Sequence, residues 1–259
     1  MVRAVGATIA EVEKLERMPA IEIMVKGAIR INRIEAITLA RAAAAIAGMV
    51  EAVPQIPEER KIIVASQYGN TTPHIDKARE LLEAKGYEFI SFHSIGTGGE
   101  TLEELLAPGC LDMIQFWAHD TVPERFRDRD FYFHNPNSTL VRTNQEESKE
   151  LGRVFAEKVN KAIGPTVVAI PLRGWSILDT EGAYLTVHYD GTTTGRHWYD
   201  PDADRAFIEA LEANLDQSKN NIELAKFDLH INDPRFAQIT SSILDDMIAG
   251  RWMKGNKYD

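Results

Sequence analysis

The sequence contains one cysteine, Cys110, among 259 residues. A chain with a single thiol can form no disulfide within itself, and it lacks the clustered cysteines of a structural zinc site. Such cysteine usage is typical of reducing compartments. The N-terminal stretch 1–18 carries acidic residues where a secretory signal would be continuously apolar. We therefore expect a cytoplasmic protein.

The chain also lacks an excess of basic residues and any long apolar run. Its 39 acidic and 29 basic residues give a net charge of −10, which argues against general binding to nucleic acid or to an anionic membrane. No window approaches the ~18 consecutive apolar residues of a membrane span. Hydrophobic residues make up 44% of the chain, enough to bury the core of a large domain. The composition predicts a globular protein that binds neither nucleic acid nor a membrane.

Short apolar runs alternate with amphipathic segments between residues 61 and 250. Strands are predicted at 61–66, 87–92, 166–170 and 222–229, and helices at 75–85, 145–162, 202–215 and 234–248. Strand–helix–strand order predicts right-handed crossovers between parallel strands. The fold class is therefore α/β, with a Rossmann-like parallel sheet flanked by helices.

Three segments lie outside this pattern. Residues 1–53 are rich in alanine, and the nearly uninterrupted apolar run 34–53 predicts a helical extension that a partner subunit or the main domain covers. Alternating apolar residues around Asp190-Gly191 predict a β-hairpin over 182–199. We interpret this hairpin as an arm that reaches a neighbouring subunit. Residues 251–259 form a basic, aromatic tail.

A glycine-rich loop follows the second predicted strand, and Thr97, Gly98 and Gly99 are its central residues. Glycine lets a ligand approach the backbone closely. A helix is predicted to begin at Glu100, and the free amides at a helix start favour an anion. The loop therefore predicts a site for an anionic small molecule. Its spacing matches neither the Walker motif nor the dinucleotide fingerprint, so a tight strand-to-helix turn is the alternative.

Polar residues also follow the other predicted strands, where open parallel sheets bind their ligands. Thr71 and Thr72 follow the first strand, and they would either contact the anion or cap the next helix. Arg173 follows the third strand, where a guanidinium would serve as counter-charge. A structural ion pair is the alternative for Arg173.

Four further residues complete the candidate site. His93 ends the second predicted strand and His230 follows the fourth, so either would be the acid or base of a catalysed step. The alternatives are a structural histidine and a simple turn. His134 and Arg142 are candidate ligand contacts. No metal is predicted, because His119-Asp120 lacks the spacing of a metal-binding motif.

A set of motifs in this order resembles the Tm-1-like ATP-binding protein family. The matching strings are Ala43–Val50, Tyr68–Pro73, Phe92–Gly99, Gly109–Phe116, Asp120–Phe126, His134–Pro136, Leu140–Thr143, Pro171–Gly174 and His230–Phe236. Together they extend over roughly residues 20 to 250, and they are specific as a set.

The resemblance implies two Rossmann-like halves with a cleft between them, and ATP as a ligand of the glycine-rich first half. This chain is expected to correspond mainly to the second half. It also passes from Leu106 to Pro108-Gly109 where the family usually carries another strand–helix–strand segment. A homo-oligomer, or a hetero-oligomer with a chain that supplies the first half, is therefore expected.

Two functions are consistent with the sequence. The first is a subunit that binds an anionic small molecule, such as a nucleotide or a phosphorylated or carboxylate metabolite, and that acts as a hydrolase or lyase if it is catalytic. The alternative is a non-catalytic oligomerisation or interaction subunit. The apolar helix at 34–53 and the hairpin at 182–199 favour this alternative.

Overall fold

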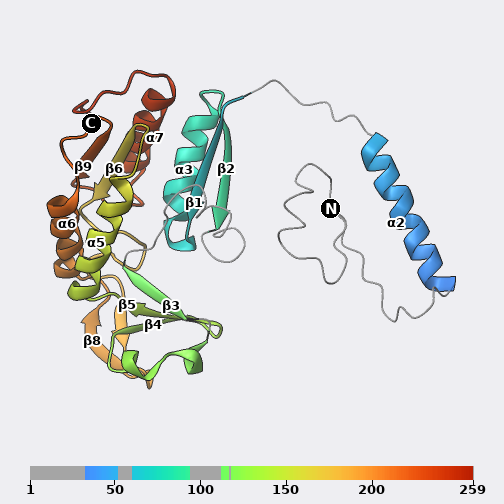
Figure 1. The fold of residues 1–259 in the computed structure, drawn as a ribbon. Helices are drawn as coiled ribbons and strands as arrows, with labels where there is room; N and C mark the ends of the chain where they lie inside the picture. Colours follow the sequence, from blue (N-terminus) through green and yellow to red (C-terminus); the bar gives the residue numbers. More distant parts are fainter. Residues whose placement is uncertain (1–32, 52–59, 94–111, 117, 259) are drawn as a thin grey trace. The chain divides into compact units, whose positions relative to one another are not determined.

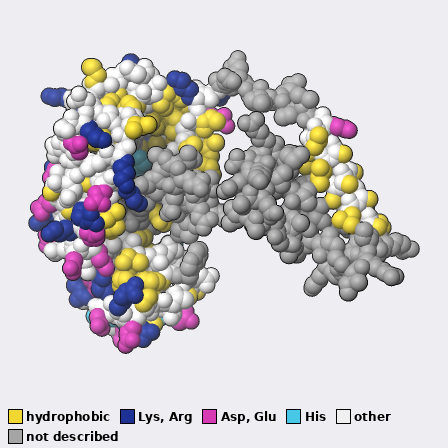
Figure 2. All heavy atoms as spheres, in the orientation of Figure 1, with side chains coloured by type: hydrophobic (Ala, Val, Ile, Leu, Met, Phe, Trp, Pro, Cys, Tyr) yellow, Lys and Arg dark blue, Asp and Glu magenta, His cyan; other side chains and the backbone are white. Residues whose placement is uncertain are grey.

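The computed structural model describes residues 33–51, 60–93, 112–116 and 118–258. The chain divides into two units, residues 1–59 and residues 60–259. In the first unit the described part is the helix α2 (Arg33–Glu51), drawn in blue in Figure 1. Apolar side chains cover much of its visible face (Figure 2). Ile37 and Val50 are 50% and 63% exposed, so much of this helix is uncovered within its own unit.

The second unit contains two pairs of parallel strands. The strand β1 (Ile62–Gln67) pairs with β2 (Glu88–His93), and the helix α3 (Thr72–Glu83) connects them. The strand β6 (Thr166–Pro171) pairs with β9 (Ile222–Phe227), with the helix α6 (Pro201–Asn214) between them in sequence. The predicted α/β class is confirmed. The two pairs, however, form separate two-stranded sheets rather than one continuous parallel sheet.

The helix boundaries follow from local capping. The helix α5 (Gln145–Val159) begins with a capping box, in which Asn144 Oδ1 accepts from Glu147 N at 2.8 Å and Glu147 Oε2 accepts from Asn144 N at 3.0 Å. The helix α7 (Pro234–Ile248) has Asp233 as its N-cap and proline in its first turn. The helix α6 begins in the same way, after Asp200. These signals are local, and the sequence shows them directly.

The helices α5 and α6 touch through their backbones. A Cβ atom at Gly152 would lie 2.3 Å from the carbonyl oxygen of Phe207, so only glycine permits this approach. The contact buries a core cluster that includes Ala156, Leu211 and Ile222. A second core cluster lies between β9 and α7. The helix α7 also packs against α3, which joins the two parallel pairs.

A five-stranded antiparallel sheet completes the unit (Figure 1). Its strands are β3 (Met113–Phe116), β5 (Ser138–Arg142), β4 (Phe131–Asn135), β7 (Leu185–Val187) and β8 (Thr193–His197), in that spatial order. Short 3-10 turns lie at Gly69–Thr71, His119–Thr121 and Glu124–Phe126. The predicted hairpin is present as β7 and β8, and β7 pairs with β4. The segment interpreted as an arm is therefore part of the antiparallel sheet.

The tail after α7 packs back onto the second unit. Tyr258 donates to Asp246 Oδ2 at 3.1 Å, and Lys254 donates to the carbonyl oxygens of Gln217 and Lys219. Trp252 packs on the core cluster of α7. In the described part of the chain, no helix combines the length and the apolar character that crossing a membrane requires.

Candidate functional site

The loops that follow β1, β6 and β9 meet at one backbone oxygen. The carbonyl oxygen of Asn70 accepts from Ile177 N at 3.3 Å and from Asn232 Nδ2 at 3.0 Å. Ile231 N donates to Gly174 O at 3.0 Å, which joins the last two loops to each other. Three loops at the carboxyl ends of parallel strands are thus held together, at the position where α/β proteins bind ligands.

A cavity of about 640 Å³ opens beside Asn70. The loop after β1 contributes one side of the cavity, and the antiparallel sheet and the loop after β6 contribute the others. Its lining includes Tyr68, Asn70, Gln115, Tyr132, His134 and Tyr184. We call this space the strand-end cavity.

The strand-end cavity has an aromatic and amide lining. Tyr132 meets Tyr184 edge to face, with ring centroids 5.8 Å apart and an interplanar angle of 89°. Gln115 Nε2 donates to Ser138 Oγ at 2.9 Å, which orients its side-chain amide. Among the described residues that line the cavity, none is an aspartate, glutamate, lysine or arginine. The described part of the lining therefore carries no permanent charge.

Among the predicted site residues, one lines the cavity and two shape the turn beside it. His134 lies on β4 and lines the strand-end cavity. Thr71 Oγ1 donates to Tyr68 O at 3.1 Å and Thr72 N donates to Gly69 O, so both residues shape the turn that carries Asn70. His93 ends β2 opposite Gln67. Its side chain lies outside the described residues, as do Thr97, Gly98 and Gly99.

Arg173 lies on the surface in an ion pair. Its Nε and Nη2 atoms donate to the two carboxylate oxygens of Asp228 at 2.7 and 2.8 Å. The side chain of Arg173 is 64% exposed and that of Asp228 is 72% exposed. The hydrogen bond from Arg173 lowers the pKa of Asp228. This is the ion pair that the sequence left open as the alternative, and Arg173 does not line the strand-end cavity.

His230 is held by hydrogen bonds at both ring nitrogens. Its Nδ1 accepts from Asn232 N at 3.1 Å, so the hydrogen is carried by Nε2 in a neutral ring. That Nε2 lies 3.0 Å from Ser176 O and 3.2 Å from Thr180 Oγ1. In this arrangement His230 joins two loops, and neither of its nitrogens is available to transfer a proton to a ligand.

Arg142 does not fit its predicted role as a ligand contact. The residue is 5% exposed, and each of its five N–H groups has an acceptor within the protein. The acceptors are Trp198 O at 2.9 Å, Asp112 O at 3.2 Å, Thr143 Oγ1 at 3.1 Å, Asp179 Oδ1 at 3.2 Å, Asp204 Oδ1 at 2.9 Å and Asp200 O at 3.3 Å. Its guanidinium is a structural charge in the core, which corrects the prediction.

Three buried carboxylates surround this guanidinium, and we call Arg142, Asp112, Asp179 and Asp204 the Arg142 cluster. Burial raises the pKa of Asp179 and raises that of Asp204 to about 8. The negative charge of the neighbouring Asp179 raises the pKa of Asp204 further. The pair therefore holds one proton at neutral pH.

The third carboxylate is balanced differently. Asp112 Oδ2 accepts from Ser176 Oγ at 2.6 Å and from Trp198 Nε1 at 3.1 Å. Across the residues that the structure describes, no group of three or more histidine, cysteine, aspartate or glutamate side chains is arranged to hold a metal ion. The cluster is thus an ionic element of the core beside the strand-end cavity.

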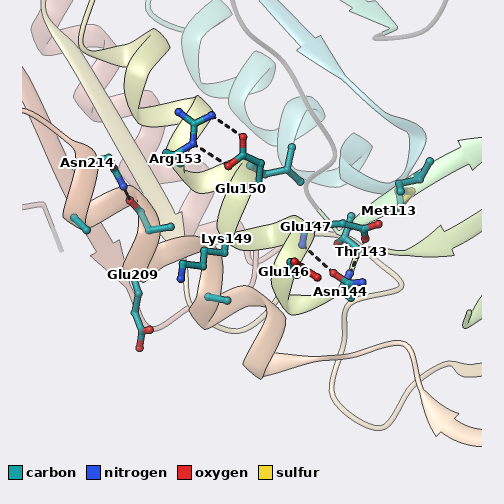
Figure 3. A pocket seen from close by; sticks show the side chains of 15 residues that line it. Met113, Thr143, Asn144, Glu146, Glu147, Lys149, Glu150, Arg153, Glu209 and Asn214 are labelled. Atoms are coloured by element: carbon teal, nitrogen blue, oxygen red, sulfur yellow. Dashed lines mark hydrogen bonds and ion pairs between the residues drawn. The ribbon is translucent and has the colours of Figure 1, made fainter.

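A wider hollow of about 1080 Å³ lies along α5, between α6 and β3. Figure 3 shows that much of its polar lining is paired within α5 itself. Arg153 donates to both carboxylate oxygens of Glu150 at 2.8 and 2.6 Å, and Glu147 is bound to Asn144 in the capping box. These groups satisfy one another, so the strand-end cavity is the better candidate site.

Comparison with known proteins identifies the family. Residues 60–107 and 104–248 match the model of the C-terminal domain of the uncharacterised protein family UPF0261. The chain is 30% identical to a UPF0261 protein of Clostridium tetani, over 84% of this chain and 61% of the relative. It is 31% identical to a UPF0261 protein of Rhizobium meliloti, over 84% and 62%. The chain therefore belongs to the UPF0261 family.

The resemblance to Tm-1 is also confirmed at the level of sequence. The chain is 27% identical to the ToMV resistance protein Tm-1(GCR237) of Solanum lycopersicum, over 80% of this chain and 32% of the relative. The chain spans 61 and 62% of the length of the two bacterial relatives.

Sequence reasoning missed most of the strand-end cavity. Tyr68 and Asn70 could have been predicted as site residues, because they closely follow the strand predicted at 61–66. Gln115, Tyr132 and Tyr184 belong to strands and loops of the antiparallel sheet, and their arrangement depends on strand pairing that the sequence did not reveal.

Proposed function

We propose that this member of the UPF0261 family binds a small, ring-bearing polar molecule in the strand-end cavity. The single observation that carries the proposal is the meeting of three strand-end loops at the carbonyl oxygen of Asn70, beside a cavity of about 640 Å³. This volume is within the range of small-molecule sites. Neither ATP nor any other cofactor is assumed.

The lining favours an uncharged group inside the cavity. Tyr132 and Tyr184 offer aromatic edges and hydroxyls, and Asn70 and Gln115 offer amides. Transfer of an ion into a site without a counter-charge costs far more free energy than transfer of a neutral ring. An anionic group of the same ligand would bind outside the cavity.

Matched pairs of probes test this preference. Benzamide and nicotinamide are compared with benzoate and nicotinate, which have similar shapes and carry one negative charge. Binding is measured by saturation-transfer difference NMR and by the rise in melting temperature. We expect the two amides to bind at least about tenfold more tightly than the two acids. ATP, which the family resemblance implies, is measured separately.

The variant Asn70→Ala localises the binding. It removes the side-chain amide and keeps the backbone oxygen that joins the loops. We expect the affinity for benzamide to fall about 5- to 10-fold, as for the loss of one hydrogen bond, with little change in melting temperature. Asn220→Ala, at an exposed asparagine, is the matched control. Equal affinity in wild type and Asn70→Ala, or no binding of either amide, would contradict the proposal.

A second candidate function is self-association through α2, with a second copy of this helix as the partner. The segment 42–50 contains no charged residue, and its alanines and glycine would let two helices pack closely. Antiparallel pairing centred on Ile46 places Arg41 of each copy opposite Glu51 of the other. The uncovered apolar side chains of α2 and this charge complementarity support the proposal.

Light scattering after size-exclusion chromatography tests the self-association. We expect the wild type to elute as a dimer and Ala45→Glu to elute as a monomer, because a carboxylate at the centre of the pairing would be desolvated. Ala36→Glu, outside the overlapping turns, should stay dimeric. A monomeric wild type, or a dimeric Ala45→Glu variant, would rule out pairing through α2.

A further inference from the structure

The Arg142 cluster contains more buried negative than positive charge. It combines three carboxylates, from the start of β3, the loop after β6 and α6, with one guanidinium from β5. Asp112 Oδ2 accepts from Ser176 Oγ and Trp198 Nε1, whereas its Oδ1 is buried without a hydrogen-bond partner. Asp179 and Asp204 both form an ion pair with Arg142. One proton between these two carboxyl groups leaves them with a single negative charge, which Arg142 matches. Loss of that proton would give the pair a second negative charge beside Arg142.

The same cluster holds Trp198 in position. Arg142 Nε donates to Trp198 O at 2.9 Å, and Trp198 Nε1 donates to Asp112 Oδ2 at 3.1 Å. Arg142 Nη2 also donates to Asp200 O at 3.3 Å. The indole is fully buried, and both its ring and its backbone are bound to members of the cluster. A rearrangement of the cluster would therefore move Trp198.

Trp198 lies directly behind the wall of the strand-end cavity. It forms one core cluster with Leu140 and Leu178, and Tyr132 and Tyr184 pack against that cluster. All four of these residues also line the cavity. The centroid of the Trp198 ring is 6.2 Å from that of Tyr132. Trp198 and the wall residues in front of it thus lie between the Arg142 cluster and the strand-end cavity.

We propose that loss of the proton shared by Asp179 and Asp204 moves Trp198 and the cavity wall in front of it, and so weakens binding in the strand-end cavity. This regulation rests on the proposed function. The charged and titratable groups that face the pair are Arg142, Asp112 and Tyr199.

The direction of the pH dependence follows from the protonation of Asp179 and Asp204. Burial raises the pKa of Asp204 to about 8, so the proton is present at pH 7 and largely absent at pH 9. Burial also raises the pKa of Tyr199 above its ordinary value, so this phenol stays neutral over the same range. If binding requires the protonated pair, affinity falls about tenfold between pH 7 and pH 9.

Fluorine NMR with 5-fluorotryptophan reports on the surroundings of Trp198, behind the cavity wall, in the absence of any ligand. The protein carries Cys110→Ser, so that no thiol titrates in the same range, and resonances are assigned by single Trp→Phe substitutions. We expect the Trp198 resonance to shift with a midpoint near pH 8, and to stay constant in Asp204→Asn. The matched control is Asp202→Asn, which removes an exposed carboxylate from the first turn of the same helix. It should keep the wild-type titration.

Benzamide affinity at pH 7 and pH 9 is the second measurement. A tenfold loss in wild type that is absent in Asp204→Asn would support the regulation. A Trp198 resonance that is constant in wild type, or that shifts equally in Asp204→Asn, would overturn the movement of the wall. Constant affinity with a moving wall would overturn the link to binding. If benzamide binds at neither pH, the proposed function fails, and the fluorine titration still decides whether the wall follows the cluster.

Discussion

Replacement of Arg142 by methionine is expected to lower the free energy of unfolding of residues 60–259 by about 3–5 kcal/mol. Methionine has a similar length and no charge, so the substitution removes the guanidinium without opening a large cavity. It leaves Asp112, Asp179 and Asp204 buried without a cation. Carbonyl oxygens of Trp198 and Asp112 also lose their donor. Urea unfolding followed by circular dichroism measures the effect.

Arg153→Met is the matched control. Arg153 also forms two ion pairs, with Glu150 and Glu157, but it lies on the surface of α5 with 41% of its side chain exposed. Exposed pairs typically contribute less than about 1 kcal/mol, so this variant should unfold close to the wild type. Similar urea midpoints for the Arg142→Met variant and the wild type would show that the buried guanidinium is not required for folding.

Gly174→Ala is expected to destabilise the same unit by about 3–5 kcal/mol, from backbone strain and overpacking together. Gly174 has φ = +117°, a conformation that residues with a side chain rarely adopt. A Cβ atom there would lie 1.8 Å from Asp179 O and 2.9 Å from His230 Cδ2. The substitution therefore pushes on the Arg142 cluster and on the loops that meet at Asn70. Its measurement is the urea midpoint at pH 7.

Gly182→Ala separates the two causes of this effect. Gly182 also has a positive φ, +72°, but a Cβ atom there would have no neighbour within 4 Å. We expect a loss of only about 1–2 kcal/mol, from backbone strain alone. If the two alanine variants unfold at the same urea concentration, the close approach of Gly174 to Asp179 has no energetic consequence.

The parallel pairs and their helices could be predicted because their signals are local. The predicted helix 234–248 has the bounds of α7, since Asp233 and Pro234 mark its start in the sequence. The strand predicted at 166–170 is β6. In each case a few neighbouring residues determine where the element begins or ends. The rest of the fold depends on pairing between strands that lie far apart in the sequence.

The antiparallel sheet could not be predicted in this way. Every residue of β5 is buried, yet the strand contains Ser138, Thr139 and Arg142, so it lacks the apolar run of a buried strand. Its polar groups are satisfied by residues far away in the sequence, such as Asp179 and Asp204. The same distance explains the wrong role predicted for Arg142, because the residues around it in sequence do not show whether its acceptors belong to the protein or to a ligand.

The site could be predicted only as a location. The carboxyl ends of the strands do carry the meeting loops, as the order of elements indicated. The interaction that joins them, however, uses a backbone oxygen, and the cavity beside it depends on the antiparallel sheet. His134 is the predicted residue that the described structure places in its lining.

The junction at Asn70 has a practical consequence for mutagenesis. Both hydrogen bonds that converge there end on a main-chain carbonyl. An alanine scan read by stability would therefore leave the acceptor intact and would score position 70 as tolerant. Changes on the donor side, such as Ile177→Pro or Asn232→Ala, would break the same contacts. A library of side-chain substitutions at every position would thus assign the junction to its donor residues. It would overlook Asn70, whose carbonyl oxygen accepts both hydrogen bonds.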